Sequence, residues 1–268
     1  MRKYFNISMI QTLPFPGSYQ SKGERIEDVI DEALEQARVL SQCGFDGAIV
    51  QNMKDMPIVQ HSSMEAVAYM TAVSKEIKRN FPNLSLGILM NWDGAASLCA
   101  AEASGADFVR VEHLYTGAEV TSAGILTAQC VEICALRKKL NSAIPVYADI
   151  YETHGMPICK KDIGAAAWES VYEAFADGLY LAGKSVEESI DMCVKAKKKV
   201  DVPIIVGGGA TCENVYELLK YFDGVCVASG IKDGAVRNPI NKDQARRFCE
   251  EVARAKADAV NLYDEVKR

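Results

Sequence analysis

Short apolar segments alternate with longer amphipathic segments along the whole chain. The short segments are rich in β-branched residues, and Gly, Asp or Pro separates them from the longer ones, which is typical of a parallel α/β protein. Eight of them predict strands, at residues 7–13, 45–51, 84–90, 107–112, 144–150, 178–181, 203–206 and 224–228.

The longer segments carry helical periodicity. Apolar residues recur on one face between Ile26 and Leu40, while Glu27, Asp31 and Glu35 lie on the opposite face. Further helices are predicted at residues 63–79, 95–104, 123–140, 163–174, 187–199, 212–221 and from 242 to the end. Eight strand–helix pairs predict an α/β fold of the (β/α)8 TIM-barrel type, with eight parallel strands.

An open, doubly wound sheet is the competing fold. We favour the closed barrel because the chain has no GxGxxG fingerprint and no long crossover. Residues 1–268 are expected to form a single barrel domain, with a helical C-terminal extension from about residue 252. This extension either packs on a neighbouring copy or frays, and we expect a homo-oligomer.

Charge and cysteine content narrow the partners and the compartment. The net charge is −6, which argues against nucleic acid or an anionic membrane surface as a partner. The N-terminal apolar run is broken and stops at Pro14, so it predicts neither a signal peptide nor membrane insertion. Nine cysteines without a CxxC pair predict reduced thiols in a cytoplasmic protein. Cys130 and Cys134 share a helical face, where apolar neighbours favour a core role over a metal site.

The loops after the last two predicted strands are candidates for phosphate binding. In such barrels the active site lies at the carboxyl ends of the strands, and loops seven and eight often hold phosphate through backbone N–H groups. The alternative is that the glycines make a sharp turn, with Thr211 capping the next helix. Lys232 either pairs with the same phosphate or is an exposed loop lysine. The phosphate-binding candidates are Gly207, Gly208, Gly209, Ser229, Gly230 and Lys232.

Polar side chains also end several other predicted strands. Arg110 and Glu112 are two residues apart, so they face the same side of their strand. Arg110 lies between valines, where an unpaired charge is costly. It is therefore expected to contact either a carboxylate, Asp149 or Glu112, or an anionic ligand. The substrate-binding candidates are Gln11, Asn52, Asn91, Asp93 and Arg110.

Three residues are candidates for catalysis. Asp149 is interpreted as a general acid/base or a metal ligand, the alternative being a strand-end carboxylate satisfied by backbone N–H groups. Glu112 is the second carboxylate, and His154 follows the fifth strand and titrates near neutral pH. No cofactor is predicted, although these three side chains leave a divalent metal possible.

Several segments resemble the BtpA/SgcQ family over nearly the whole chain. They are IQTLPFPGS, GFDGAIVQN, GADFVRVEHLYTGAEVTSAGI, VYADIYETH, VGGGATCENV and DGVCVASGIKDGAVRNPIN. The resemblance implies a barrel of the phosphate-binding type. One branch of the family is associated with photosystem I biogenesis, and another with sugar-uptake and sugar-phosphate genes.

Two classes of function follow from these expectations. The first is an enzyme that acts on a small phosphorylated metabolite, sugar-phosphate or phosphoribosyl-like, by acid/base isomerisation or by lyase or aldolase chemistry. The second is a non-catalytic assembly or regulatory factor of the photosystem I biogenesis type. Such a factor would need an extended apolar surface, and no stretch of the sequence indicates one.

Overall fold

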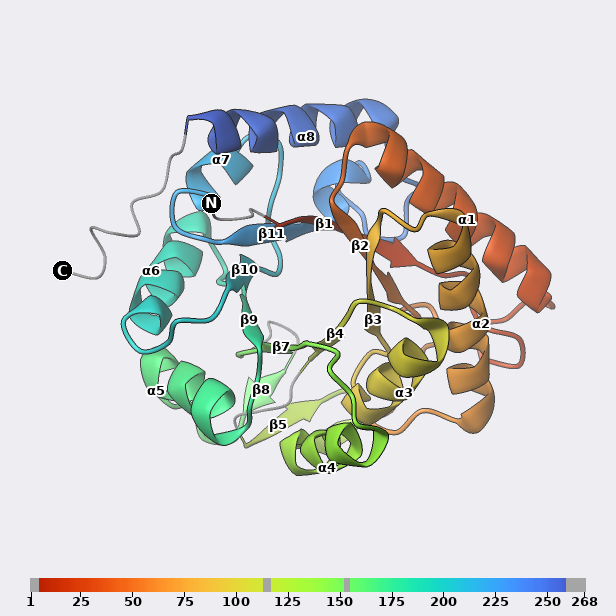
Figure 1. Ribbon diagram of the computed structural model, residues 1–268, viewed down its shortest axis with the longest axis horizontal. Helices are drawn as coiled ribbons and strands as arrows, with labels where there is room; N and C mark the ends of the chain where they lie inside the picture. The colour runs from red at the N-terminus through yellow and green to blue at the C-terminus, as the bar shows by residue number, and fades with distance from the viewer. Residues whose placement is uncertain (1–4, 113–116, 152–154, 259–268) are drawn as a thin grey trace.

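The computed structural model describes residues 5–112, 117–151 and 155–258 (Figure 1). Within these residues, eight parallel strands close a barrel in the order β1-β11-β10-β9-β7-β4-β3-β2. This confirms the predicted fold class. The barrel strands are β1 (Phe5–Gln11), β2 (Gly47–Gln51), β3 (Ser85–Leu89), β4 (Phe108–Val111), β7 (Val146–Asp149), β9 (Gly178–Leu181), β10 (Ile204–Val206) and β11 (Gly224–Val227).

The α-helices lie in a ring outside the barrel, as Figure 1 shows. A π-helical segment, η1 (Glu169–Glu173), continues α5, and a 3-10 turn, η2 (Ser229–Ile231), follows β11. The α-helices are α1 (Ile26–Cys43), α2 (Met64–Asn80), α3 (Gly94–Ser104), α4 (Cys130–Leu140), α5 (Ile163–Trp168), α6 (Val186–Lys197), α7 (Val215–Leu218) and α8 (Lys242–Ala257).

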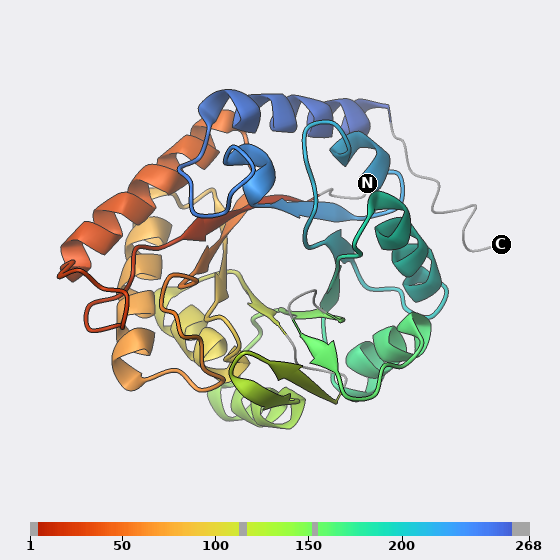
Figure 2. The same ribbon diagram turned by 180° about the vertical axis from the view of Figure 1, so that it is seen from behind.

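A small antiparallel sheet replaces the first part of one predicted helix. Residues 123–140 were expected to be helical, but only α4 is. Strands β5 (Ala118–Thr121) and β6 (Gly124–Thr127) form a hairpin, and β8 (Met156–Pro157) pairs with β5. Gly124 has a φ of 99°, which a helix cannot accommodate. The helical prediction was therefore wrong for residues 123–129. The small sheet is seen from the other side in Figure 2.

The core has two layers, because alternate strand residues face opposite sides of the barrel wall. Outward residues pack against the helices, as Ala48 and Val50 do. Inward residues fill the barrel, among them Met9, Ile49 and Phe108. These inward residues form the floor beneath the mouth of the barrel.

Helix α8 closes the ring at the C-terminal end of the described chain. It buries Val252 and Ala255, which are 2% and 1% exposed, so the region from residue 252 packs on the core as far as Ala255. The rest of the predicted extension, residues 259–268, lies outside the described residues. None of the described helices is both long enough and apolar enough to cross a bilayer.

An alanine at Gly87 is expected to destabilise the barrel, because its Cβ would overlap the ring of Phe108. Overpacking of this kind costs about 1–3 kcal/mol. Gly208→Ala is the control, since its Cβ would lie 3.5 Å from the Cβ of Ala182, an ordinary contact. Urea unfolding should show a lower midpoint for Gly87→Ala only. Equal midpoints for the two variants would contradict this account of the packing.

Candidate functional site

A cavity of about 620 Å³ lies in the mouth of the barrel, where loops from both halves of the chain meet. Ser122, in the β5–β6 turn, and Ser229, after β11, both line it, so the small sheet lies at this end of the barrel. The sequence-predicted site residues that line the cavity are Gln11, Arg110, Glu112, Asp149, Gly207, Gly208, Gly209 and Ser229.

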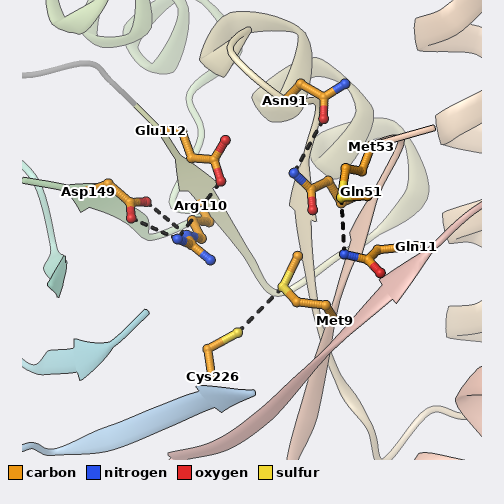
Figure 3. A network of polar contacts seen from close by, with 9 residues as sticks. All are labelled: Met9, Gln11, Gln51, Met53, Asn91, Arg110, Glu112, Asp149 and Cys226. Carbon is orange, nitrogen blue, oxygen red and sulfur yellow. Dashed lines mark hydrogen bonds and ion pairs between the residues drawn. The ribbon is translucent and has the colours of Figure 1, made fainter. Parts of the chain in front are cut away.

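A buried ion pair forms one wall of this cavity (Figure 3). Arg110 binds Asp149 with two hydrogen bonds, Nε to Oδ2 at 2.8 Å and Nη2 to Oδ1 at 2.7 Å. Glu112 Oε1 lies 3.9 Å from the same Nη2. Arg110 and Asp149 are only 6% and 5% exposed. Of the alternatives left open for Arg110, the structure contains the ion pair with Asp149, and it places that pair where a ligand could reach it.

Other residues enclose the guanidinium group. Its carbon lies 4.5 Å from the centre of the Tyr180 ring, and a Cβ at Gly207 would approach Nη2 to 3.2 Å. Burial disfavours the charge of Arg110, but Asp149 and Glu112 outweigh this effect, so its pKa lies well above its usual value. Arg110 is therefore a fixed cation in the wall of the cavity.

Cys226 lies beside this group in the barrel interior, and its Sγ is 3.4 Å from Met9 Sδ. Burial raises the pKa of the Cys226 thiol to about 11, although Arg110 opposes the shift. Because only the thiolate is a good nucleophile, Cys226 is a packing residue at neutral pH.

The glycine-rich loops form another part of the rim. Gly209 has a φ of 73°, and its carbonyl accepts a hydrogen bond from Asn214 Nδ2 at 2.8 Å. Gly207 donates its N–H to Leu181 at 2.8 Å. The backbone N–H groups of Gly208 and Gly209 have no hydrogen-bond acceptor among the residues that the structure describes. These donors remain available to an anion.

The two loops also contact each other directly. A Cβ at Gly230 would overlap the carbonyl of Ala210, so only glycine fits there. The N–H groups of Ser229 and Gly230 have no hydrogen-bond acceptor among the described residues. Gly230 itself lines a neighbouring outer cavity of about 210 Å³ rather than the mouth.

Lys232 is neither an exposed loop lysine nor a residue that lines the mouth. It is 1% exposed, and its Nζ donates to Gln11 Oε1 at 3.1 Å. Burial, together with Lys54, lowers the pKa of Lys232 to about 8, whereas Glu32 opposes the shift. Gln11 therefore separates this lysine from the cavity.

Three predicted substrate-binding residues lie away from the mouth. Asn52 follows inward-facing Gln51 and so points to the other side of the wall. Asn52 and Asn91 line a second cavity, of about 310 Å³. Asp93 caps α3 through Ala96 N at 2.9 Å and also accepts from Ser62 N at 2.6 Å.

Asn91 has a structural role at the end of β3. Its φ is 45°, its Oδ1 accepts from Gln51 Nε2 at 3.3 Å, and its Nδ2 donates to Asn52 O at 3.1 Å. His154 lies outside the described residues. Among the residues that are described, no group of three His, Cys, Asp or Glu side chains is arranged to hold a metal ion.

Sequence reasoning missed several residues of the mouth. Arg237 lines the cavity, and only its place in the segment DGAVRNP could have indicated it. Tyr151 lines it with a φ of 55°, and its hydroxyl accepts from Lys161 N at 2.6 Å. The loop side chains of Met53, Met56 and Ile58 also lie there, without any signal of function in the sequence.

Comparison with known proteins gives a consistent family signal. A model of the BtpA family matches residues 2–254. An uncharacterized protein of Thermococcus kodakarensis is 36% identical, over 91% of this chain and 93% of its own. The photosystem I biogenesis protein BtpA of Synechocystis is 28% identical, over 92% and 87%. The putative sgc region protein SgcQ of Escherichia coli is 24% identical, over 84% of each chain. The predicted BtpA/SgcQ resemblance is thereby confirmed.

Solved structures share the fold at low sequence identity. A 3-hexulose-6-phosphate synthase has a TM-score of 0.58 at 17% identity, over 92% of this chain and 99% of its own. A thiamine phosphate pyrophosphorylase from Pyrococcus furiosus has a TM-score of 0.58 at 14% identity, over 95% and 98%. Both are barrel enzymes named for phosphorylated compounds, and the likeness establishes the fold.

Replacing Lys232 with Met is expected to stabilise the protein at pH 7. The folded-state pKa of about 8 lies below the ordinary value of 10.5, so folding disfavours the lysine cation. The free-energy cost of burying this cation is about 3 kcal/mol below pH 8 and falls as the pH rises from 8 to 10.5. Urea unfolding of both proteins between pH 7 and 10.5 should show the advantage of Lys232→Met shrinking with pH. A difference independent of pH would contradict the shifted pKa.

Proposed function

The chain belongs to the BtpA family, and we propose that it is an enzyme that acts on a small phosphorylated metabolite in the mouth of the barrel. One observation carries the proposal: a single cavity combines the free N–H groups of Gly208 and Gly209 with the charged pair of Arg110 and Asp149. The N–H groups suit a bound phosphate, and the charged pair suits chemistry on the carbon skeleton that carries this phosphate.

The glycine loops are the proposed phosphate end of the site. Gly208, Gly209 and Ser229 present backbone donors to the cavity, and Arg237 adds a positive charge to its lining. Backbone N–H groups are well suited to phosphate because they are fixed in direction and need no charge of their own. Loops seven and eight also bind phosphate in many barrels of this type.

The ion pair beside these loops is the proposed site of proton transfer. Asp149 is held by two hydrogen bonds from Arg110, one to each of its carboxylate oxygens. Glu112 also lines the cavity, and its Oε1 lies 3.9 Å from the guanidinium, beyond hydrogen-bond distance. Glu112 is accordingly the proposed general acid/base, while Asp149 orients Arg110 and Arg110 orients the substrate.

The reaction class that fits is isomerisation or aldol-type cleavage of a sugar phosphate or a phosphoribosyl-like compound. Both reactions need a general base that takes a proton from carbon or oxygen and returns it nearby, and a carboxylate can fill this role. Arg110 would stabilise the negative charge that develops on the substrate oxygen. The amides of Gln11 and Gln51, which also line the cavity, would hold the substrate hydroxyls.

A second candidate is an assembly factor, as the name of the Synechocystis relative suggests for that protein. One observation favours it: Val120 pairs with Ile125 and with Met156, so the three side chains share one face of the small sheet. They are 47%, 62% and 72% exposed. An exposed apolar row of this kind is typical of a contact surface.

Phosphorylated sugars are expected to raise the melting temperature, and their unphosphorylated counterparts are not, because a ligand that binds the folded state stabilises it. Gly208→Val should lose the effect, since its side chain enters the space beside the free N–H groups. Gly208→Ala serves as the milder variant. Thermal shift measures both. If no phosphorylated compound shifts the folded wild type, the second candidate is favoured.

Glu112→Gln is expected to lower kcat at least about 100-fold with a substrate found in that panel, since it removes the acid/base group and retains the shape of the side chain. The KM should change little. Asp177→Asn is the control, because Asp177 binds Val146 N at the opposite end of β7. Steady-state kinetics measure both variants. Unchanged turnover in Glu112→Gln would remove Glu112 from the chemistry.

A further inference from the structure

A second cavity, of about 310 Å³, lies beside the mouth of the barrel, between the loops that follow β1 and β2. Met56 and Ile58 line both cavities, so this segment forms the wall that they share. A volume of this size is sufficient for a small organic molecule. The mechanism proposed above makes no use of this cavity.

Much of its lining is aromatic or apolar. Phe15 and Tyr69 lie with their ring centres 5.8 Å apart and their planes tilted by 54°. Tyr19, which is 89% exposed, lies at the same cavity. Pro16, Pro57 and Val59 add apolar surface. This lining suits the apolar body of a ligand, and its aromatic rings can also face a cation.

The charged groups of the cavity are predominantly acidic. Asp55 and Glu65 line it, and no Lys or Arg is among its described lining residues. His61, an exposed side chain, is the remaining titratable group besides the tyrosines. Neither Asp55 nor Glu65 forms an ion pair within the described part of the chain. The mouth differs, because Arg110 and Arg237 line it together with Glu112 and Asp149.

Asp55 is fixed in place without a cation. Its Oδ1 accepts from Phe15 N at 2.7 Å, and its Oδ2 accepts from Asn52 Nδ2 at 3.0 Å. Burial raises the pKa of the Asp55 carboxyl, although these hydrogen bonds oppose the shift. Asn52 Oδ1 accepts no hydrogen bond from the described residues. The cavity therefore offers acceptors and two carboxylates, and the hydroxyl groups of Ser18, Ser62 and Ser63 also line it.

We propose that this cavity binds a small organic cation, an ammonium group carried on an apolar body. The carboxylates of Asp55 and Glu65 attract the ammonium group. The rings of Phe15 and Tyr69 contact the apolar body of the ligand and turn their faces to the cation. An anion would be repelled by both carboxylates. The two carboxylates therefore make this cavity favour a cation over an anion, and this site does not depend on the function proposed for the mouth.

Isothermal titration calorimetry with three compounds of similar shape tests the proposal. Phenethylamine, which is cationic at pH 7, should bind, whereas neutral 2-phenylethanol and anionic 3-phenylpropionate should bind at least about tenfold more weakly. Saturating inorganic phosphate should leave the affinity for the amine unchanged. Equal affinity for the alcohol, no binding of the amine, or its displacement by phosphate would each overturn the proposal.

Variants then locate the bound amine. Glu65→Gln and Tyr69→Leu should each weaken phenethylamine binding about threefold or more. Glu27→Gln is the matched control, because Glu27 is also an exposed glutamate in the first turn of a helix, α1 instead of α2. Gly208→Val should bind the amine like the wild type. If Glu65→Gln and Tyr69→Leu, both shown to be folded by circular dichroism, retain full affinity, the assignment to this cavity is wrong.

Discussion

The buried charge of Arg110 sets conditions that much of the barrel mouth has to meet. A guanidinium group that is 6% exposed must be paired, and Asp149 pairs with it in a bidentate arrangement from the neighbouring strand β7. The ring of Tyr180 supports it on one side, and glycine at position 207 leaves it room. The residues around it are small, aromatic or acidic for this reason. The same arrangement fixes the charged pair of Arg110 and Asp149 in the wall of the cavity.

The sequence predicts the barrel because its periodicity is a local property. Alternation along the fourth strand also places Arg110 and Glu112 correctly on one side. The hairpin at residues 118–127 could not be predicted in this way, because β5 is paired by β8 from another loop. The burial of Lys232 is equally non-local, since it depends on Gln11, 221 residues earlier. Asn52 and Asn91 follow strands as catalytic residues do, yet they line a different cavity.

The arrangement of the two cavities assigns a role to the segment after β2. Met56 and Ile58 contact both spaces, and Gln60 holds the small sheet by donating from Nε2 to Thr127 O at 2.8 Å. This segment therefore links the barrel wall, the small sheet and both cavities. The two side chains that both cavities share, Met56 and Ile58, are apolar, so they separate the two spaces without adding charge to either.

The contact between Gly230 and Ala210 has a consequence for how this rim can change over evolutionary time. The loops after β10 and β11 touch so closely that a side chain on one would displace the backbone of the other. Neither loop can therefore take up a new shape by itself. The two loops therefore constitute one structural unit, and a substitution that changes the shape of either has to be accommodated by both.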